Sequence, residues 1–367
     1  MPTTSELHIA TIPGDGIGQE IMQACLAVLD SIQQRVGGYR LVFDQYQIGA
    51  GLYQREGVDM HEKDFQAIGK ADAMLLGAIG LPGVRYKDGT EISPHLRIRD
   101  EFGLYAGIRP VKAYPNVPRR LLDERAAGID LIVMRESTEG LFFTHGRGEV
   151  IEDQVATETL RITRPICEKL FDAAFKLARQ RKQRGGMGRV TCVDKANVFR
   201  AFAFFRKIFD ERAALNPDIE IGYNYVDAQA LDLIRRPWEF DVLVMENMFG
   251  DIISDLGGGL VGGMGMAPCA ELGDRHGLFQ PAHGSAPDIM GQDKANPMAM
   301  FLSAAMMLDW LAERRALPAL ADAARMLNEA IDRGFETARL QPMEFGGSQG
   351  MAECTRSLLE ILQSRRV

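Results

Sequence analysis

The sequence has little that would place it in a membrane or outside the cell. No run approaches the roughly 18 uninterrupted apolar residues that a membrane span needs. The first residues, MPTTSELHIA, have neither a basic start nor a long apolar segment, so no secretory signal is expected. The five cysteines are scattered without a C-x-x-C pair. This sparse set disfavours a disulfide framework or a zinc site, and we expect a cytoplasmic protein with free thiols.

An excess of basic residues is also lacking. The chain has 42 Lys and Arg against 50 Asp and Glu, a formal net charge of −8. This balance argues against a general nucleic-acid binder, which gains affinity by neutralising phosphates. The 46% hydrophobic and 25% charged residues are ordinary for a soluble globular protein. A length of 367 residues predicts two domains, or one large domain with a divided core.

Short apolar runs alternate with longer helical patterns along the chain, which predicts an α/β fold. The expected strands, buried on both faces, are residues 7–12, 73–79, 129–134, 189–193 and 240–245, and the expected helices are 19–35, 164–184 and 297–315. No low-complexity linker separates these elements. Any two domains must therefore share an extensive interface, or the chain must cross between them more than once.

The segment 145–163 differs from its surroundings because it is polar and charged, with β-branched residues interleaved. The segment fits two alternatives equally well: an exposed loop, or an arm that pairs with another subunit.

Polar side chains follow three of the expected strands. Arg135 and Glu136 follow the third run, residues 194–197 follow the fourth, and Glu246 and Asn247 follow the fifth. Ligands of open α/β sheets bind at the carboxyl ends of strands. These three strand ends are therefore the best places to look for a site.

Two aspartates, Asp251 and Asp255, lie four residues apart after the last of these strands. On a helix they share one face, and such a pair suits a hard cation such as Mg²⁺ or Mn²⁺. The alternative is that Asp251 caps the helix and Asp255 is solvated.

Three arginines, Arg99, Arg109 and Arg135, could converge on one cleft. Guanidinium groups bind carboxylates bidentately, so such a cluster would recognise an organic acid. Taken singly, each arginine fits an exposed surface position as well.

Two glycine-rich segments resemble known motifs only weakly. Residues 13–18 read GxGxG instead of the GxGxxG of dinucleotide-binding folds. Residues 346–350 match GxSxG, but the preceding QPMEF does not read as a strand, so a serine hydrolase is not expected. Residues 283–288 form a turn that could present amides to phosphate.

Together the segments resemble the β-decarboxylating dehydrogenases, the family of isopropylmalate, isocitrate, D-malate and tartrate dehydrogenases. The matching segments occur in the family's order, from residue 12 to about residue 300. They are IPGDGIGQE (12–20), LRIRDEFGLYAGIRP (96–110), RESTEG (135–140), VDKANVF (193–199), VDA (226–228), ENMFGDIISDLGGGL (246–260), PAHGSAPDI (281–289) and ANPMAM (295–300).

The resemblance implies two interlocked α/β domains around a central cleft, and not a Rossmann fold. Residues 1–105 and 260–367 would form the NAD-binding domain. Residues 106–259 would bind substrate and metal and would dimerise through an arm at about 143–163.

The resemblance also implies an NAD-dependent oxidation of a 2-hydroxy dicarboxylate, followed by β-decarboxylation. Mg²⁺ or Mn²⁺ would be bound by Asp251, Asp255 and Asp227 of a second subunit in a homodimer with shared active sites. Lys195 would be the base, Asp227 would also belong to the catalytic residues, and Asn197 would line the substrate and nicotinamide pocket. The NAD-contacting positions would be His283, Gly284, Ser285, Ala286, Asp288, Ile289 and Asn296. A carboxylate at Asp288 would repel the 2′-phosphate of NADP, which predicts NAD.

The chain departs from the family at Phe142, where most members carry a tyrosine thought to protonate the enol. A phenyl ring cannot donate a proton. Water, Thr144 or His145 could replace the tyrosine, the enol could be released more slowly, or the chain could be a weakly active or regulatory paralogue. We expect an active enzyme, because Lys195 and the three aspartates are present.

A second departure concerns the substrate. Isopropylmalate enzymes have consecutive leucines before the arginine that matches Arg99, whereas only Leu96 is retained here. Ser93 and His95 are polar, and an isopropyl group would leave them unpaired. The sequence thus predicts a D-malate- or tartrate-like substrate with a polar or small C3 substituent. The alternatives are 3-isopropylmalate and, less favoured, a regulatory subunit of a hetero-oligomeric dehydrogenase.

Overall fold

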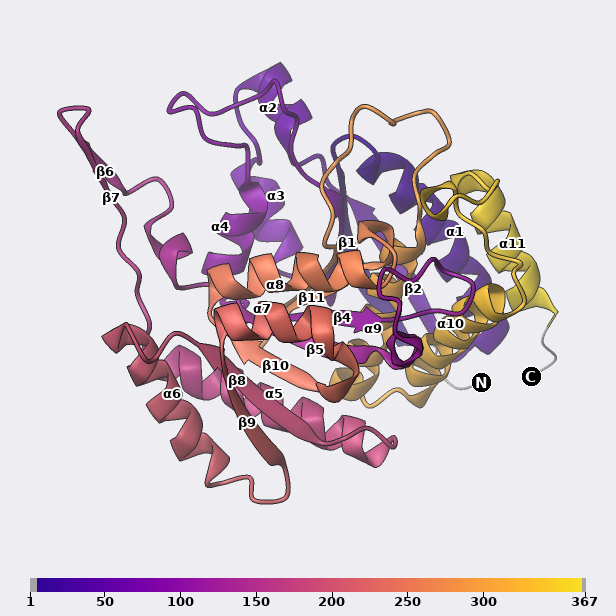
Figure 1. Cartoon of the computed structure of the whole chain (residues 1–367). Helices are drawn as coiled ribbons and strands as arrows, with labels where there is room; N and C mark the ends of the chain where they lie inside the picture. Colours follow the sequence, from indigo (N-terminus) through magenta and orange to yellow (C-terminus); the bar gives the residue numbers. More distant parts are fainter. Residues whose placement is uncertain (1–4, 365–367) are drawn as a thin grey trace.

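A ten-stranded mixed sheet with helices on both faces organises the chain (Figure 1). The computed structural model describes residues 5–364. The strand order is β2-β1-β3-β12-β11-β4-β5-β10-β8-β9. This order includes antiparallel strands and differs from the 3-2-1-4-5-6 order of a Rossmann fold. The predicted α/β class is therefore confirmed, and so is the exclusion of a Rossmann domain.

The two ends of the chain build one half of this sheet. Its strands are β1 (Ser5–Gly14), β2 (Tyr39–Gln45), β3 (Ala73–Ala78), β11 (Pro268–Leu272) and β12 (Gly277–Pro281). The helices α1 (Gly18–Val36), α9 (Met298–Arg315), α10 (Pro318–Glu336) and α11 (Met351–Gln363) share a core with one face. On the other face lie α2 (Ala50–Glu56), α3 (Glu62–Ile68) and α4 (Pro94–Glu101), of which α3 and α4 contribute to a second core.

The middle of the chain builds the other half. Its strands are β4 (Ala106–Lys112), β5 (Asp130–Glu136), β8 (Arg189–Asp194), β9 (Glu220–Tyr225) and β10 (Val242–Met245). The helices α5 (Arg164–Gln183) and α6 (Arg200–Ala213) cover one face, and α7 (Val226–Arg235) and α8 (Asn247–Leu260) cover the other. Ile132 and Leu131 lie in different cores, as expected for a strand buried on both faces.

The two halves meet where β11 pairs antiparallel with β4. The strands from the chain ends and the strands from the middle occupy separate halves of the sheet. These halves correspond to the two proposed domains, residues 1–105 plus 260–367 and residues 106–259. Because the sheet is continuous across this junction, the boundaries near residues 105 and 260 stay a prediction.

The segment 145–163 contains a small antiparallel hairpin of β6 (Glu149–Ile151) and β7 (Val155–Thr157). It projects away from the body of the molecule (Figure 1). Val150, Ile151 and Val155 are exposed on it. An exposed apolar strand pair is suited to pairing with another chain, but the partner stays a prediction.

The GxGxG segment has a packing role. Gly14 and Gly16 have φ of +73° and +53°, and a Cβ on Gly16 would lie 2.0 Å from the carbonyl oxygen of Ser285. The glycines therefore allow the turn after β1 to pack against the 283–288 turn. Residues 346–350 follow a single turn of 3₁₀ helix (Met343–Phe345), not a strand. The context of a nucleophile elbow is thus absent there.

Candidate active site

The three strand ends chosen from the sequence lie together. β10 pairs in parallel with both β5 and β8, so Met245 is in register with Arg135 on one side and Val193 on the other. The polar residues that follow these strands therefore emerge at one edge of the sheet.

The three predicted arginines are all buried, with at most 7% of their surface exposed. The Arg99 side chain, on α4, donates to the carbonyl oxygen of Ser137 at 2.8 and 3.1 Å. Arg109, on β4, donates to Ser254 Oγ at 2.7 Å. The alternative of three exposed arginines is wrong.

Arg135 is the most constrained of these side chains. Its Nε and Nη2 donate to Asn247 Oδ1 at 2.9 and 2.7 Å, and its Nη1 contacts Asp251. A Cβ on Gly250 would lie 2.6 Å from Arg135 Cβ, so a glycine lets α8 approach this closely. Burial, with Arg99 and Arg109 nearby, lowers the pKa of Arg135 to about 9. The guanidinium remains charged at neutral pH.

Asp251 and Asp255 lie on one face of α8, as predicted. Arg109 Nη1 is 3.3 Å from Asp251 Oδ1 and 3.8 Å from Asp255 Oδ1. Both carboxylates are about half exposed. Glu246 caps the helix by accepting the N–H of Phe249, so the alternative that Asp251 caps it is wrong.

The pair fits part of a site for a hard divalent cation. Burial raises the pKa of Asp255, and Asp251 adds to the effect while Arg109 opposes it. A cation between these oxygens would relieve the repulsion. Within residues 5–364, however, no three His, Cys, Asp or Glu side chains form a group that could hold a metal ion. The described residues thus offer two carboxylates at this place.

An inner cavity of about 400 Å³ joins most of the predicted substrate residues. Its lining includes Ser93, His95, Arg99, Arg109, Arg135, Phe142 and Asp251. Burial and the neighbouring Arg99 lower the pKa of His95 to about 3, so this histidine is neutral. Its Nδ1 is buried without a hydrogen-bond partner among the described residues. Ser93 Oγ already donates to the carbonyl oxygen of Glu91 at 3.1 Å.

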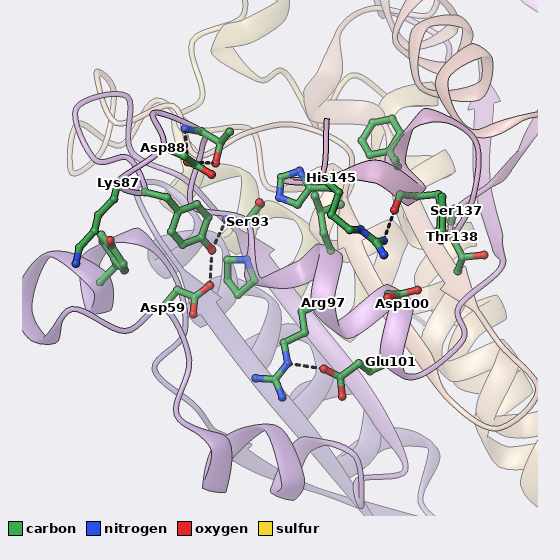
Figure 2. A pocket seen from close by; sticks show the side chains of 18 residues that line it. Asp59, Lys87, Asp88, Ser93, Arg97, Asp100, Glu101, Ser137, Thr138 and His145 are labelled. Atoms are coloured by element: carbon green, nitrogen blue, oxygen red, sulfur yellow. Dashed lines mark hydrogen bonds and ion pairs between the residues drawn. The ribbon is translucent and has the colours of Figure 1, made fainter. Parts of the chain in front are cut away.

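An outer cavity of about 680 Å³ adjoins the inner one. Four residues, Ser93, Leu96, Phe142 and His145, border both cavities. Figure 2 shows the outer cavity between Lys87 and Asp88 on one side and Ser137 and Thr138 on the other. The Phe142 ring lies 5.1 Å from the Arg135 guanidinium.

Lys195 and Asp227 form an ion pair with each other. The hydrogen bond from Lys195 lowers the pKa of Asp227. Neither residue borders the inner cavity, and neither does Asn197, which is exposed in the loop after β8. The chain therefore brings the arginines together with Asp251 and Asp255, and holds the proposed base apart from them.

A third cavity, of about 450 Å³, contains most of the predicted cofactor residues. It is bordered by His283, Gly284, Ala286, Ile289 and Asn296. Ser285 is buried beside it and accepts the N–H of Ile17 through its carbonyl oxygen at 2.8 Å. Asp288 is exposed and does not border this cavity.

Glu271 was missed by the sequence analysis. It lies on β11 with no exposed surface, and its Oε1 is 4.0 Å from Arg99 Nη1. The segment PCAELGD carries no motif that signals a buried carboxylate, because its burial depends on arginines from distant parts of the chain.

The comparisons with known proteins agree with this arrangement. A profile of the isocitrate/isopropylmalate dehydrogenase family matches residues 8–358. A 3-isopropylmalate dehydrogenase of Heyndrickxia coagulans is 37% identical over 98% of this chain and 97% of its own length. A 3-isopropylmalate/3-methylmalate dehydrogenase of Methanocaldococcus jannaschii is 40% identical over 90% and 93%.

Solved structures give the same result. An isocitrate dehydrogenase from Methylococcus capsulatus has a TM-score of 0.85 at 31% identity and covers 98% of this chain and 100% of its own. A β-decarboxylating dehydrogenase from Thermococcus kodakarensis has a TM-score of 0.76 at 33% identity, covering 97% and 96%. The predicted enzyme class, a β-decarboxylating oxidoreductase, is confirmed. The chain belongs to the isocitrate/isopropylmalate dehydrogenase family.

Proposed function

We propose that this protein oxidises and decarboxylates a malate carrying a substituent at C3, using NAD and a divalent cation, with 3-isopropylmalate as the first candidate. The observation that carries the proposal is the inner cavity, where three buried arginines lie beside Asp251, with Asp255 near Arg109 on the same face of α8. This combination binds an organic diacid at one end and a cation at the other.

The side chains at the cavity have two roles, binding of the substrate carboxylates and binding of the cation. Arg99, Arg109 and Arg135 hold the carboxylates of the substrate through charge-assisted hydrogen bonds. Asp251 and Asp255 would hold Mg²⁺ or Mn²⁺, which when bound polarises the C2 oxygen as a Lewis acid.

A second copy of the chain would complete the site. Lys195, as a neutral amine, would take the proton of the C2 hydroxyl, and Asp227 would supply the third carboxylate. This assignment is supported by the absence of both residues from the lining of the inner cavity in the same chain. Leu231, Ile234 and Ile252 are exposed on α7 and α8, and Val198 and Phe199 are exposed after Lys195. Such apolar surface suits a homodimer interface.

The choice of substrate depends on two observations that point in different directions. The named relatives favour 3-isopropylmalate over the D-malate or tartrate predicted from the sequence. The buried, unpartnered Nδ1 of His95 favours a polar C3 substituent, which remains the second candidate. An isopropyl group would leave this nitrogen unpaired at a cost of about 1–3 kcal/mol.

NAD is the proposed cofactor, because Asp288 is next in sequence to Ile289, which borders the 450 Å³ cavity, and a carboxylate near the bound cofactor would repel the 2′-phosphate of NADP. The five cysteines are buried and free, which suits the cytoplasm as the proposed location. None of the helices within residues 5–364 is long and apolar enough to cross a membrane. Nothing in the acidic composition supports a nucleic-acid partner.

The test is NADH formation with Mn²⁺ and a panel of 3-isopropylmalate, D-malate, D- and L-tartrate and isocitrate. We expect a stoichiometric release of CO₂ with one of the dicarboxylates. His95→Leu serves as the specificity variant and should improve kcat/KM for 3-isopropylmalate relative to D-malate. A folded protein that is inactive on the whole panel contradicts the proposal and favours a regulatory subunit.

A further inference from the structure

Glu271 places a fixed negative charge beneath the arginine cluster. It is in register with Gly107 across the β11–β4 pair, and its side chain has no exposed surface. Oε1 lies 4.0 Å from Arg99 Nη1 and accepts a weak hydrogen bond from Cys269 Sγ at 3.5 Å. Oε2 has no hydrogen-bond partner among the described residues.

The surrounding backbone makes room for this carboxylate. A Cβ on Gly107 would lie 2.9 Å from Glu271 Oε2 and 2.7 Å from Ser137 Oγ. Any larger residue at position 107 would have to displace the carboxylate or the hydroxyl. Glu271 is thus accommodated by a glycine on the neighbouring strand.

Glu271 is ionised in spite of its burial. Burial alone opposes the charged form, but Arg99, Arg109 and Arg135 outweigh it and hold the pKa of Glu271 below its ordinary value. A buried carboxylate is costly unless cations compensate it. The arginines therefore compensate Glu271 as well as Asp251 and Asp255. With a divalent cation bound by the two aspartates, the three arginines, the three carboxylates and the cation would leave an excess of two positive charges.

Space does not limit the number of carboxylates that the site could take. The inner cavity of about 400 Å³ opens towards the outer cavity of about 680 Å³ along shared residues. The outer cavity adds no positive excess, because its lining has three cationic and four anionic side chains: Lys87, Arg97, Arg147, Asp59, Asp88, Asp100 and Glu101. His95, which borders the inner cavity, is neutral.

We propose that Glu271 is a specificity-determining positioning residue that selects a dicarboxylate substrate against a tricarboxylate. It offsets one of the three guanidinium charges, so a third carboxylate on the ligand meets no uncompensated cation. The inference rests on the proposed function, since it concerns the same cavity.

The experiment measures binding of malonate and tricarballylate by calorimetry at fixed ionic strength, with Mg²⁺ in excess over the anions and without NAD. The readout is the ratio of the two dissociation constants, which does not depend on the folded fraction. Glu271→Gln should shift this ratio towards tricarballylate by about tenfold, the size expected for one unit charge roughly 10 Å away at an effective dielectric constant of about 20.

Two control variants distinguish an effect of the lost charge on the ratio from an effect of a changed structure. Glu271→Asp retains the charge and should keep the wild-type ratio within about twofold. Glu136→Gln replaces another buried carboxyl group, one that bonds to Thr138 instead of the arginines, and should also keep the ratio. If Glu271→Gln does not fold, a tenfold shift in Glu271→Asp overturns the inference and an unchanged ratio supports it.

The outcomes distinguish the two proposals. Binding of malonate by the wild type with an unchanged ratio in Glu271→Gln overturns the role of Glu271 alone. Failure of the folded wild type to bind either anion contradicts the proposed function itself.

Discussion

Replacing Arg135 with lysine tests the geometry of the cavity while keeping its charge. The guanidinium makes two contacts to Asn247 Oδ1 and one to Asp251, whereas an ammonium group cannot span both partners. Hydrogen bonds to charged groups contribute about 1.5–3 kcal/mol each, and the two to Asn247 share one oxygen. We therefore expect Arg135→Lys to cost about 3 kcal/mol of transition-state stabilisation, a loss in kcat/KM of roughly a hundredfold.

The assay is the initial rate of NADH formation at saturating NAD and Mn²⁺, with thermal unfolding measured alongside. Arg212→Lys is the matched control, since Arg212 contacts Asp172 through Nε and Nη2 at 2.7 Å each on the outer helices α5 and α6. This control should change kcat/KM by less than about threefold, because the ion pair is partly exposed and remote from the cavity. A loss below tenfold in a folded Arg135→Lys protein would refute the reasoning.

Three further predictions concern the cofactor, the missing tyrosine and stability. Asp288→Lys should narrow the preference for NAD over NADP, because it replaces a carboxylate that repels the 2′-phosphate of NADP with an ammonium group that attracts it. An unchanged ratio of kcat/KM for the two cofactors contradicts the role of Asp288 in cofactor choice. Phe142→Tyr should speed decarboxylation, measured as CO₂ release in a single turnover, because a phenol can donate a proton near Arg135. An unchanged rate shows that the position is not limiting. Burial raises the pKa of Glu136 to about 7, so the native state holds its proton more tightly than the unfolded state. This contribution to stability is present at acidic pH and is lost as the pH rises through 7. In Glu136→Gln the fall in Tm between pH 5.5 and 8.5 should be smaller than in wild type, and equal falls contradict the role of Glu136.

The sequence predicted those parts of the fold that depend on local patterns. The runs at 73–79 and 189–193 became β3 and β8, because continuous apolar residues bounded by turns suit a strand buried on both faces. The aspartates of α8 and the three arginines were found from their spacing and from the resemblance. β9 was not predicted, since as an edge strand it alternates polar and apolar residues over a partly exposed face.

Other features depend on contacts between distant residues. The burial of Glu271 requires Arg99 and Arg135, which lie more than 130 positions away in the sequence. Likewise, the spacing of Lys195 and Asp227 relative to Asp251 does not reveal that the two residues pair with each other and do not border the inner cavity. Such relations follow from the topology of the sheet, and a single sequence does not encode them in any local pattern.

The central claim is that one active site takes its arginines, Asp251 and Asp255 from one protomer and Lys195 with Asp227 from the other. Complementation tests this claim directly, with Lys195→Ala and Asp251→Ala expressed separately and then together. Each variant alone should be inactive, because both of its sites lack an essential group.

In a mixed dimer one site would be intact and the other would lack both groups. With random pairing, half of the dimers are mixed, so co-expression should restore about a quarter of the wild-type activity. Mixed dimers that remain as inactive as the separate variants would contradict a shared site.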